Sequence, residues 1–277
     1  MNLKDLTVVI VTFKSDEIIL KCLKSIPQEI PVIVVENSNN HDFKKKVENS
    51  FKNINCILTG ENKGYAPANN IGLKLVKSKY ALVLNPDALL DKNAINNFLK
   101  TAESLKEFWL IGPGNDQMID IDFKEDNIKE VDNLKGFAIF FNMSKFSDKY
   151  FDENFFLFFE EIDLCRRVKN NNGKIYLDKR ILINHIGGSS VNRKKSFELE
   201  KNRNWHWMWS TFYYHKKYNG FFIAFILVFP KLLSAVIKTI IYFLLFNKKN
   251  KEIYMCRLSG LFNSIINRNS WYRPAVD

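Results

Sequence analysis

Three carboxylates follow directly on an aromatic and aliphatic run in residues 155–167, FFLFFEEIDLCRR. Glu160, Glu161 and Asp163 have apolar neighbours, and burial raises the pKa of a carboxyl group toward the range in which it accepts a substrate proton at neutral pH. The alternative is a plain helix N-terminus, where acidic side chains suit the macrodipole and Asp163 pairs with an arginine one turn on. This stretch therefore predicts a general base or a helix start.

Polar side chains also follow three predicted strands, at the point where each strand ends. Thr12 follows the first strand, Glu36-Asn37-Ser38 follow the second, and Asn85-Pro86-Asp87 follow the fourth. Parallel strands of an open α/β sheet present their carboxyl ends at one edge, where such sheets bind ligands. We expect these groups to converge on one crevice.

Two further segments carry polar groups near that crevice. Residues 61–72, ENKGYAPANNIG, hold Gly64, which permits an unusual backbone, and Asn69 and Asn70, which can hydrogen-bond a polar ligand near a helix start. An ordinary strand-to-helix turn is the alternative. His185 follows an apolar strand and precedes two glycines, a place typical of a structural histidine or of a ligand.

The elements that would position these residues are visible as periodic patterns. Apolar, β-rich runs predict strands at 6–13, 31–37, 55–60, 80–86, 110–113, 134–141, 174–179 and 181–190. Amphipathic patterns predict helices at 15–26, 41–51 and 66–78, the first beginning near Ser15. Strands that alternate with helices predict an α/β fold with a mostly parallel central sheet covered on both faces.

Composition separates the chain into two parts. The 277 residues carry a net charge of +11, yet residues 1–190 hold 26 basic and 26 acidic side chains, whereas residues 191–277 hold 15 and 4. A neutral body with a basic tail indicates that the tail meets an anionic partner. The four scattered cysteines and the missing export signal predict a cytoplasmic setting.

The apolar stretch 221–246 is long enough to span a bilayer, but it contains Pro230, Lys231 and Lys238. A helix beginning at Pro230 would align Lys, Ser, Lys and Tyr at 231, 234, 238 and 242, a pattern that favours an amphipathic helix lying on the membrane. A buried helical hairpin or an oligomer interface, such as a homodimer, is the alternative. The aliphatic run is poorly suited to nucleic acid, which we exclude as a partner.

The order of motifs resembles the family 2 glycosyltransferases of the GT-A fold, and among them the bacterial rhamnosyltransferase-like enzymes of O-antigen and cell-wall polysaccharide assembly. The motifs are VTF, VVENS, ENKGYAPANNIGL, LVLNPDALL, KGFAIFF, FFLFFEEIDLCRR and INHIGGSS. The resemblance covers residues 5–217. It implies a GT-A catalytic domain at 1–204, with a helical, membrane-associating C-terminal region at 205–277.

The resemblance implies an inverting transfer from a nucleotide-diphospho-sugar, with L-rhamnose from dTDP-rhamnose as one donor, to a polyprenyl-diphosphate-linked glycan. Glu161 matches the general base, with Glu160 and Asp163 in supporting roles. Asp87 and His185 match ligands of a divalent cation, Mg²⁺ or Mn²⁺, bound weakly because Asn85 replaces an acid. The implied substrate-binding residues are Thr12, Phe13, Glu36, Asn62, Gly64, Asn69, Asn85, Gly136, Arg167, Arg193 and Arg203.

The implied place of action is the cytoplasm, with the protein peripheral on the inner face of the bacterial plasma membrane. Basic residues of the tail, Arg193 and Arg203 among them, are candidates for the diphosphate of the acceptor. A UDP-sugar donor or a non-lipid acceptor is the alternative, with the C-terminal region then serving as an oligomer interface.

Overall fold

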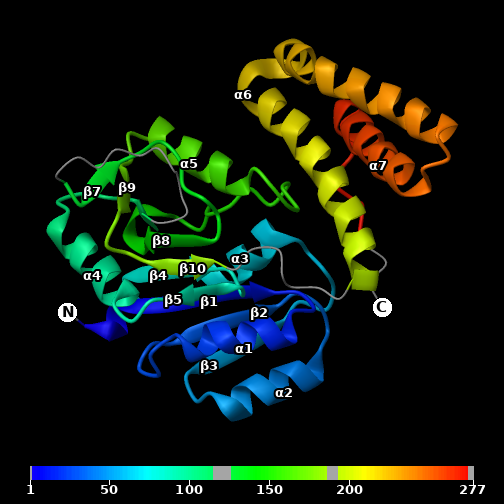
Figure 1. Cartoon of the computed structure of the whole chain (residues 1–277). Coiled ribbons are helices and arrows are strands. Elements are labelled where there is room, and N and C mark those ends of the chain that lie inside the picture. The colour runs from blue at the N-terminus through cyan, green and yellow to red at the C-terminus, as the bar shows by residue number, and fades with distance from the viewer. Residues whose placement is uncertain (1, 115–125, 186–192, 274–277) are drawn as a thin grey trace. The chain divides into compact units, whose positions relative to one another are not determined.

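The computed structural model describes residues 2–114, 126–185 and 193–273, apart from the side chains of residues 193–196. The chain divides into two compact units, shown in Figure 1. The first comprises Met1–Asp152 and Glu160–Ser190, and the second Glu153–Phe159 and Val191–Asp277. The short segment 153–159 therefore belongs to the second unit, although the acidic helix that follows it belongs to the first.

The first unit is built on an eight-stranded sheet with the order β3-β2-β1-β4-β8-β6-β9-β7. Its strands are β1 (Leu6–Thr12), β2 (Val32–Glu36), β3 (Ile54–Leu58), β4 (Tyr80–Leu84), β6 (Leu110–Pro113), β7 (Ile128–Glu130), β8 (Ala138–Asn142) and β9 (Ile175–Asp178). Strands β1 to β4 are parallel, as is the pair β6 and β9, while β8 and β7 run antiparallel to their neighbours. The prediction of a mostly parallel central sheet is confirmed.

A separate two-stranded sheet pairs β5 (Ala88–Leu90) with β10 (Ile183–His185). The helices of this unit are α1 (Asp16–Lys24), α2 (His41–Ser50), α3 (Tyr65–Leu73), α4 (Ala94–Ser104) and α5 (Glu160–Asn170), with short 3₁₀ turns at Leu3–Asp5 and Met143–Lys145. Ser15 precedes α1, but its hydroxyl donates to the carbonyl of Phe13 at 3.0 Å instead of accepting from the helix.

The sheet forms the core because its central strands are apolar and covered on both faces. Every residue of β1, β2 and β4 is buried. The rings of Phe98 on α4 and Phe140 on β8 stack at 5.1 Å. Gly72 lets α3 approach the sheet closely, since a Cβ at that position would overlap the side chains of Val9 and Val35. These contacts fix the strand ends on which the candidate site is built.

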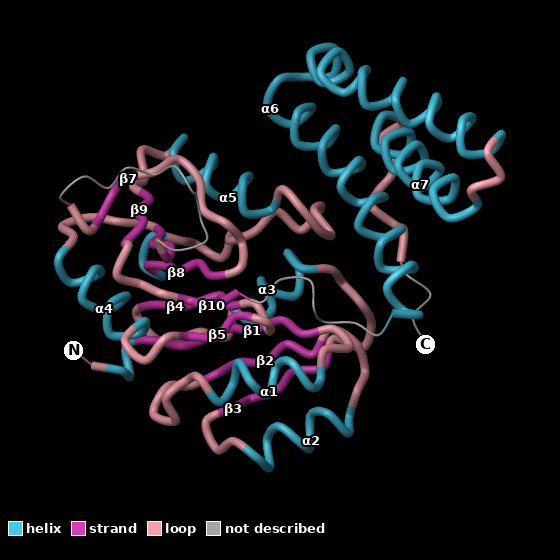
Figure 2. The backbone as a smooth tube through the Cα atoms, in the orientation of Figure 1, coloured by secondary structure: helices cyan, strands magenta, loops and turns pink. Residues whose placement is uncertain are grey.

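The second unit is helical, with α6 (Arg193–Leu244) and α7 (Lys248–Ile265). Gly220, at φ +78°, breaks α6 into two arms, and Figure 2 shows the sharp bend. The prediction of a helix start at Pro230 is wrong, because Pro230 lies within the second arm. Glycine adopts a positive φ at no steric cost, so the chain turns there, whereas proline removes only one helical hydrogen bond.

The packed interior of this unit is small and its surface is unusually apolar. Met208, Phe212, Ala224, Val228 and Leu261 form the core. Over the described residues, the segment Phe197–Leu244 is long and apolar enough to cross a membrane, and only 17% of its most apolar window is buried. Most of that apolar surface is therefore not accounted for by packing within the chain.

Candidate functional site

The ends of β1 and β2 lie in register, with Thr12 opposite Glu36. Thr12 is buried, and its hydroxyl has no hydrogen-bond partner among the described residues. The Glu36 carboxylate accepts from the Ser38 hydroxyl at 2.6 Å and from the backbone N–H of Asn40 at 3.0 Å. Glu36 thus organises the entry to α2, and Thr12 is the group at this edge with free hydrogen-bonding capacity.

Asn37, one of the polar residues predicted at the end of the second strand, organises the loop that precedes α3. Its amide nitrogen donates to Asn62 Oδ1 and to the Gly64 carbonyl, both at 3.1 Å, and its oxygen accepts from the Lys63 N–H at 3.0 Å. Asn62 Oδ1 also accepts from the Gly64 N–H at 3.1 Å. Gly64 has φ +92°, which favours glycine. Hydrogen bonds from Asn37 and Asn62 therefore fix the conformation of the loop before α3.

Asp87 and His185 come together through the small sheet of β5 and β10, in which His185 pairs with Ala88. His185 Nε2 lies 3.3 Å from Asp87 Oδ1, and both side chains are mostly buried. The Phe137 ring stacks on the imidazole at 4.6 Å and fixes its plane. Asn85 Oδ1 is buried without a partner among the described residues. Among the described residues no group of three or more His, Cys, Asp and Glu side chains gathers to hold a metal ion, but a carboxylate and an imidazole are ligand types that suit a divalent cation such as Mn²⁺.

The acidic pair lies at the start of α5, where the two glutamates have different surroundings. Glu160 is buried, and its Oε2 finds no partner among the described residues. Burial, and then the charge of Glu161, raises the pKa of Glu160 well above its ordinary value. Burial also raises the pKa of Glu161, but backbone N–H groups of Glu161 and Ile162 stabilise its carboxylate. Burial thus raises the pKa of both carboxyl groups, and backbone N–H groups at the start of α5 counteract the shift in each.

Asp163 and Arg167 form an ion pair one turn apart on α5, with Arg167 Nε 2.8 Å from Asp163 Oδ2. Arg167 also donates to the carbonyls of Lys149, at 3.3 Å, and of Tyr150. These bonds tie the chain before residue 151 to α5. Arg167 is thus engaged in holding this segment, and Asp163 orients it.

Tyr65, the first residue of α3, is a site residue that the sequence did not single out. Its hydroxyl donates to the Gly136 carbonyl at 2.7 Å, and a Cβ on Gly136 would lie 3.6 Å from Cβ of Glu161. Burial raises the pKa of Tyr65 well above its ordinary value, and the charges of Glu160 and Glu161 add to it. The only sequence signal was its place in the 61–72 motif.

Asn69 lies one helical turn after Tyr65 on α3. Its amide nitrogen donates to the Tyr65 carbonyl at 2.9 Å, while Oδ1 is buried without a partner among the described residues. The first unit therefore holds four such buried, unpartnered atoms within the described chain, on Thr12, Asn69, Asn85 and Glu160. Buried polar atoms are normally hydrogen-bonded, so four at predicted ligand positions indicate a polar ligand.

Two further predicted residues are partly or fully exposed, and the side chain of a third is not described. Phe13 is partly exposed beside the strand end, with its carbonyl bonded to Ser15. Arg203 is exposed on α6, in the second unit. The side chain of Arg193 lies outside the described residues.

The sequence model for glycosyl transferase family 2 matches residues 7–176, more than half of the chain. The chain belongs to this family. The family match spans strands β1 and β2, whose ends carry Thr12 and Glu36, the Asn85 to Asp87 motif and the acidic helix α5. Within the family, the chain is 29% identical over 197 residues to the low-salt glycan biosynthesis hexosyltransferase Agl10 of Haloferax volcanii, covering 61% of this chain and 63% of that protein.

A second curated relative is the teichoic acid poly(glycerol phosphate) polymerase of Staphylococcus epidermidis, 32% identical over 103 residues. That match covers 34% of this chain and 14% of the polymerase, so the chain spans less than two thirds of both relatives.

Solved structures show the same fold at low identity. The mannosyltransferase PcManGT from Pyrobaculum calidifontis, in complex with GDP-Man and Mn²⁺, aligns with TM-score 0.57 and 11% identity over 94% of this chain and 87% of that one. S. aureus TarS 1–349 with UDP-GlcNAc aligns with TM-score 0.51 and 14% identity over 97% and 93%. These likenesses establish a GT-A fold with a long C-terminal helix.

Proposed function

We propose that this chain transfers a sugar, with inversion, from a nucleotide-diphospho-sugar to a hydroxyl of a glycan acceptor. The observation that carries the proposal is the buried acid pair at the start of α5, in which burial raises the pKa of both Glu160 and Glu161 and Glu161 lies beside Gly136. A base with a raised pKa suits proton removal from an alcohol near neutral pH. The unpartnered Thr12 and Asn69 oxygens, in the same unit, supply polar contacts for the donor.

In the proposed reaction, Glu161 accepts the proton of the acceptor hydroxyl as its oxygen bonds to the anomeric carbon of the donor. The bond from that carbon to the diphosphate breaks, and the nucleoside diphosphate leaves with the electron pair. Asp87 and His185, with Asn85, would hold a divalent cation, which supplies charge neutralisation of the leaving diphosphate. Tyr65 fixes Gly136 beside Glu161 and so positions the base.

The sequence resemblance favours L-rhamnose from dTDP-rhamnose as the donor. The acceptor that we propose is a polyprenyl-diphosphate-linked glycan of surface polysaccharide, O-antigen among the candidates, at the cytoplasmic face of the plasma membrane. The exposed apolar second arm of α6 supports membrane association, since Phe222 and Ile226 are 82% and 70% exposed. The relatives named for glycan and teichoic acid biosynthesis support a surface polymer.

A thermal-shift screen of dTDP-rhamnose and of UDP- and GDP-sugars, with and without Mn²⁺, tests the donor. We expect one nucleotide class to raise the melting temperature, more so with metal, and Asp87→Ala to remove the metal-dependent part. Stabilisation by none of the nucleotides, together with no release of nucleoside diphosphate, contradicts the proposed activity.

Co-sedimentation with lipid vesicles tests the membrane part separately. We expect the full chain to bind vesicles and Ile226→Ser to weaken that binding. A chain that stays in solution as a dimer, with Ile226→Ser producing monomers, would instead show that the exposed arm is an oligomer interface.

A further inference from the structure

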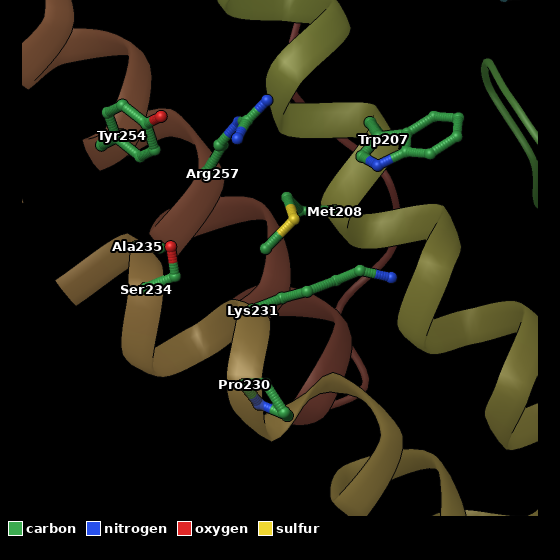
Figure 3. Close-up of a pocket in the computed structure, with 8 residues that line it drawn as sticks. All are labelled: Trp207, Met208, Pro230, Lys231, Ser234, Ala235, Tyr254 and Arg257. Carbon is green, nitrogen blue, oxygen red and sulfur yellow. The ribbon is translucent and has the colours of Figure 1, made fainter. Parts of the chain in front are cut away.

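A cavity of about 250 Å³ opens among the helices of the second unit. Figure 3 shows it between the two arms of α6 and α7, with Lys231 extending from the second arm toward the first. Six of its lining residues are Trp207 and Met208 from the first arm, Lys231 and Ser234 from the second, and Tyr254 and Arg257 from α7. The cavity lies wholly within the helical unit, and no part of the proposed transfer reaction uses it.

Cations gather at this cavity in a fixed arrangement. Arg257 Nε donates to Asn204 Oδ1 at 2.6 Å, and the guanidinium carbon lies 5.1 Å from the centre of the Tyr254 ring. These contacts hold the guanidinium and leave its terminal nitrogens without an acceptor among the described residues. Lys231 likewise has no ion pair there. Lys238 Nζ donates to the Tyr254 hydroxyl at 3.2 Å and adds a third positive charge.

The glutamates of these helices do not neutralise the cavity. Glu198 and Glu252 lie 2.6 and 3.6 Å from Lys201 Nζ, and Glu200 lies 3.3 Å from Lys249 Nζ. Each acidic side chain of α6 and α7 within the described residues is therefore committed to a lysine outside the cavity. The positive charges at the cavity would therefore have to be neutralised by a bound anion.

The exposed apolar stripe of the second arm indicates where that ligand lies. Phe222, Ile226, Leu233, Ile237 and Ile240 are spaced by three, four or seven residues, one or two helical turns, and are 82%, 70%, 49%, 46% and 54% exposed. At 3.6 residues per turn, Lys231 falls on the opposite side of the helix and Ser234 about a quarter turn from the stripe. An interfacial helix buries its apolar face about 5–10 Å deep and is about 10–12 Å wide. Its other side then lies at headgroup level.

We propose that this cavity binds the phosphate group of an anionic membrane phospholipid, held by Lys231 and Arg257 with Ser234 as a further hydrogen-bond donor. The inference rests on the proposed membrane association of the helical unit. A guanidinium fork and an ammonium are suited to phosphate oxygens, and Arg257 is already fixed by Asn204 and Tyr254. The volume is below the range of about 300–1,000 Å³ for whole drug-sized ligands, so it fits a headgroup phosphate and not an acyl chain.

Vesicle co-sedimentation of the full chain tests the site, with phosphatidylcholine vesicles compared with vesicles that also contain phosphatidylglycerol. We expect wild type to prefer the anionic vesicles. Lys231→Gln should reduce that preference by about ten- to a hundredfold, the worth of a charged hydrogen bond. Lys248→Gln is the matched control, because it removes the same charge from an exposed position outside the cavity and should cost about fivefold or less.

Arg257→Lys keeps the net charge, so general attraction to the surface predicts no change, whereas the phosphate site predicts a clear loss of preference. Unchanged thermal transitions show that each variant is folded. Equal losses in Lys231→Gln and Lys248→Gln, or a preference abolished by inorganic phosphate at the concentration of the lipid phosphate, overturn the lipid site alone. Binding to neither vesicle overturns the membrane proposal as well, whereas the donor screen is unaffected by either result.

Discussion

The different surroundings of the two adjacent glutamates lead to opposite expectations for two isosteric substitutions. Glu161→Gln removes the carboxylate that we propose as the base. Glu160→Gln replaces an acid whose pKa burial raises with a neutral side chain of the same size. Neither change creates a cavity or a new overlap, so the effect on turnover reports chemistry and not packing.

The expected magnitude follows from the role of each side chain. Loss of a general base costs about 10² to 10⁴ in rate, which corresponds to about 3–5 kcal/mol in the barrier. We therefore expect Glu161→Gln to reduce transfer by that factor while donor binding survives. For Glu160→Gln we expect less than about fivefold, or about 1 kcal/mol. Release of nucleoside diphosphate measures turnover, and thermal shift by the donor measures binding.

The pH dependence provides a second measure of the same assignment. Burial raises the pKa of Glu161, and the base must be ionised, so turnover should rise with pH through that raised pKa and then level off. Full activity in Glu161→Gln refutes the assignment of the base. A large loss in Glu160→Gln with Glu161→Gln still active would transfer the role to Glu160.

Three further changes test the packing around the site. Because the pKa of Glu160 is raised in the native state, the native state binds a proton at pH values where the unfolded chain has lost it, and the free energy of unfolding should fall as pH rises above the ordinary glutamate pKa. Glu160→Gln should then raise the melting temperature at pH 7 but not at pH 4. An equal shift at both pH values contradicts this. Tyr65→Phe leaves the Gly136 carbonyl without its donor and should cost about 1–3 kcal/mol in urea unfolding while also slowing turnover; loss of stability with normal turnover would remove Tyr65 from the positioning role. Gly72→Ala overlaps Val9 and should cost about 1–3 kcal/mol, so wild-type stability would contradict the close approach of α3 to β1.

Much of the fold could be predicted from the sequence because the relevant signals are local. Buried parallel strands are continuous apolar runs, and the helices between them have a period that the sequence shows directly. The prediction of a helix start at Pro230 failed because proline is a strong signal for a helix boundary. The bend lies instead at Gly220, a position that the apolar pattern does not mark. The pairing of Asp87 with His185 was expected only from family resemblance, since β5 and β10 are far apart in the chain.

Tyr65 was missed for a related reason, because it acts through a partner, Gly136, that only the folded chain brings near. The same limit applies to the acid pair. Glu160 and Glu161 are identical and adjacent, so no composition or spacing argument separates their chemistry. On a helix, however, adjacent side chains point about 100° apart. Glu160 therefore enters the interior, where its Oε2 has no partner among the described residues, while Glu161 lies at the Gly136 edge of the site. The proposed division of roles between the two glutamates thus depends on the first turn of α5, and a change that rotates this turn should exchange or abolish the two roles.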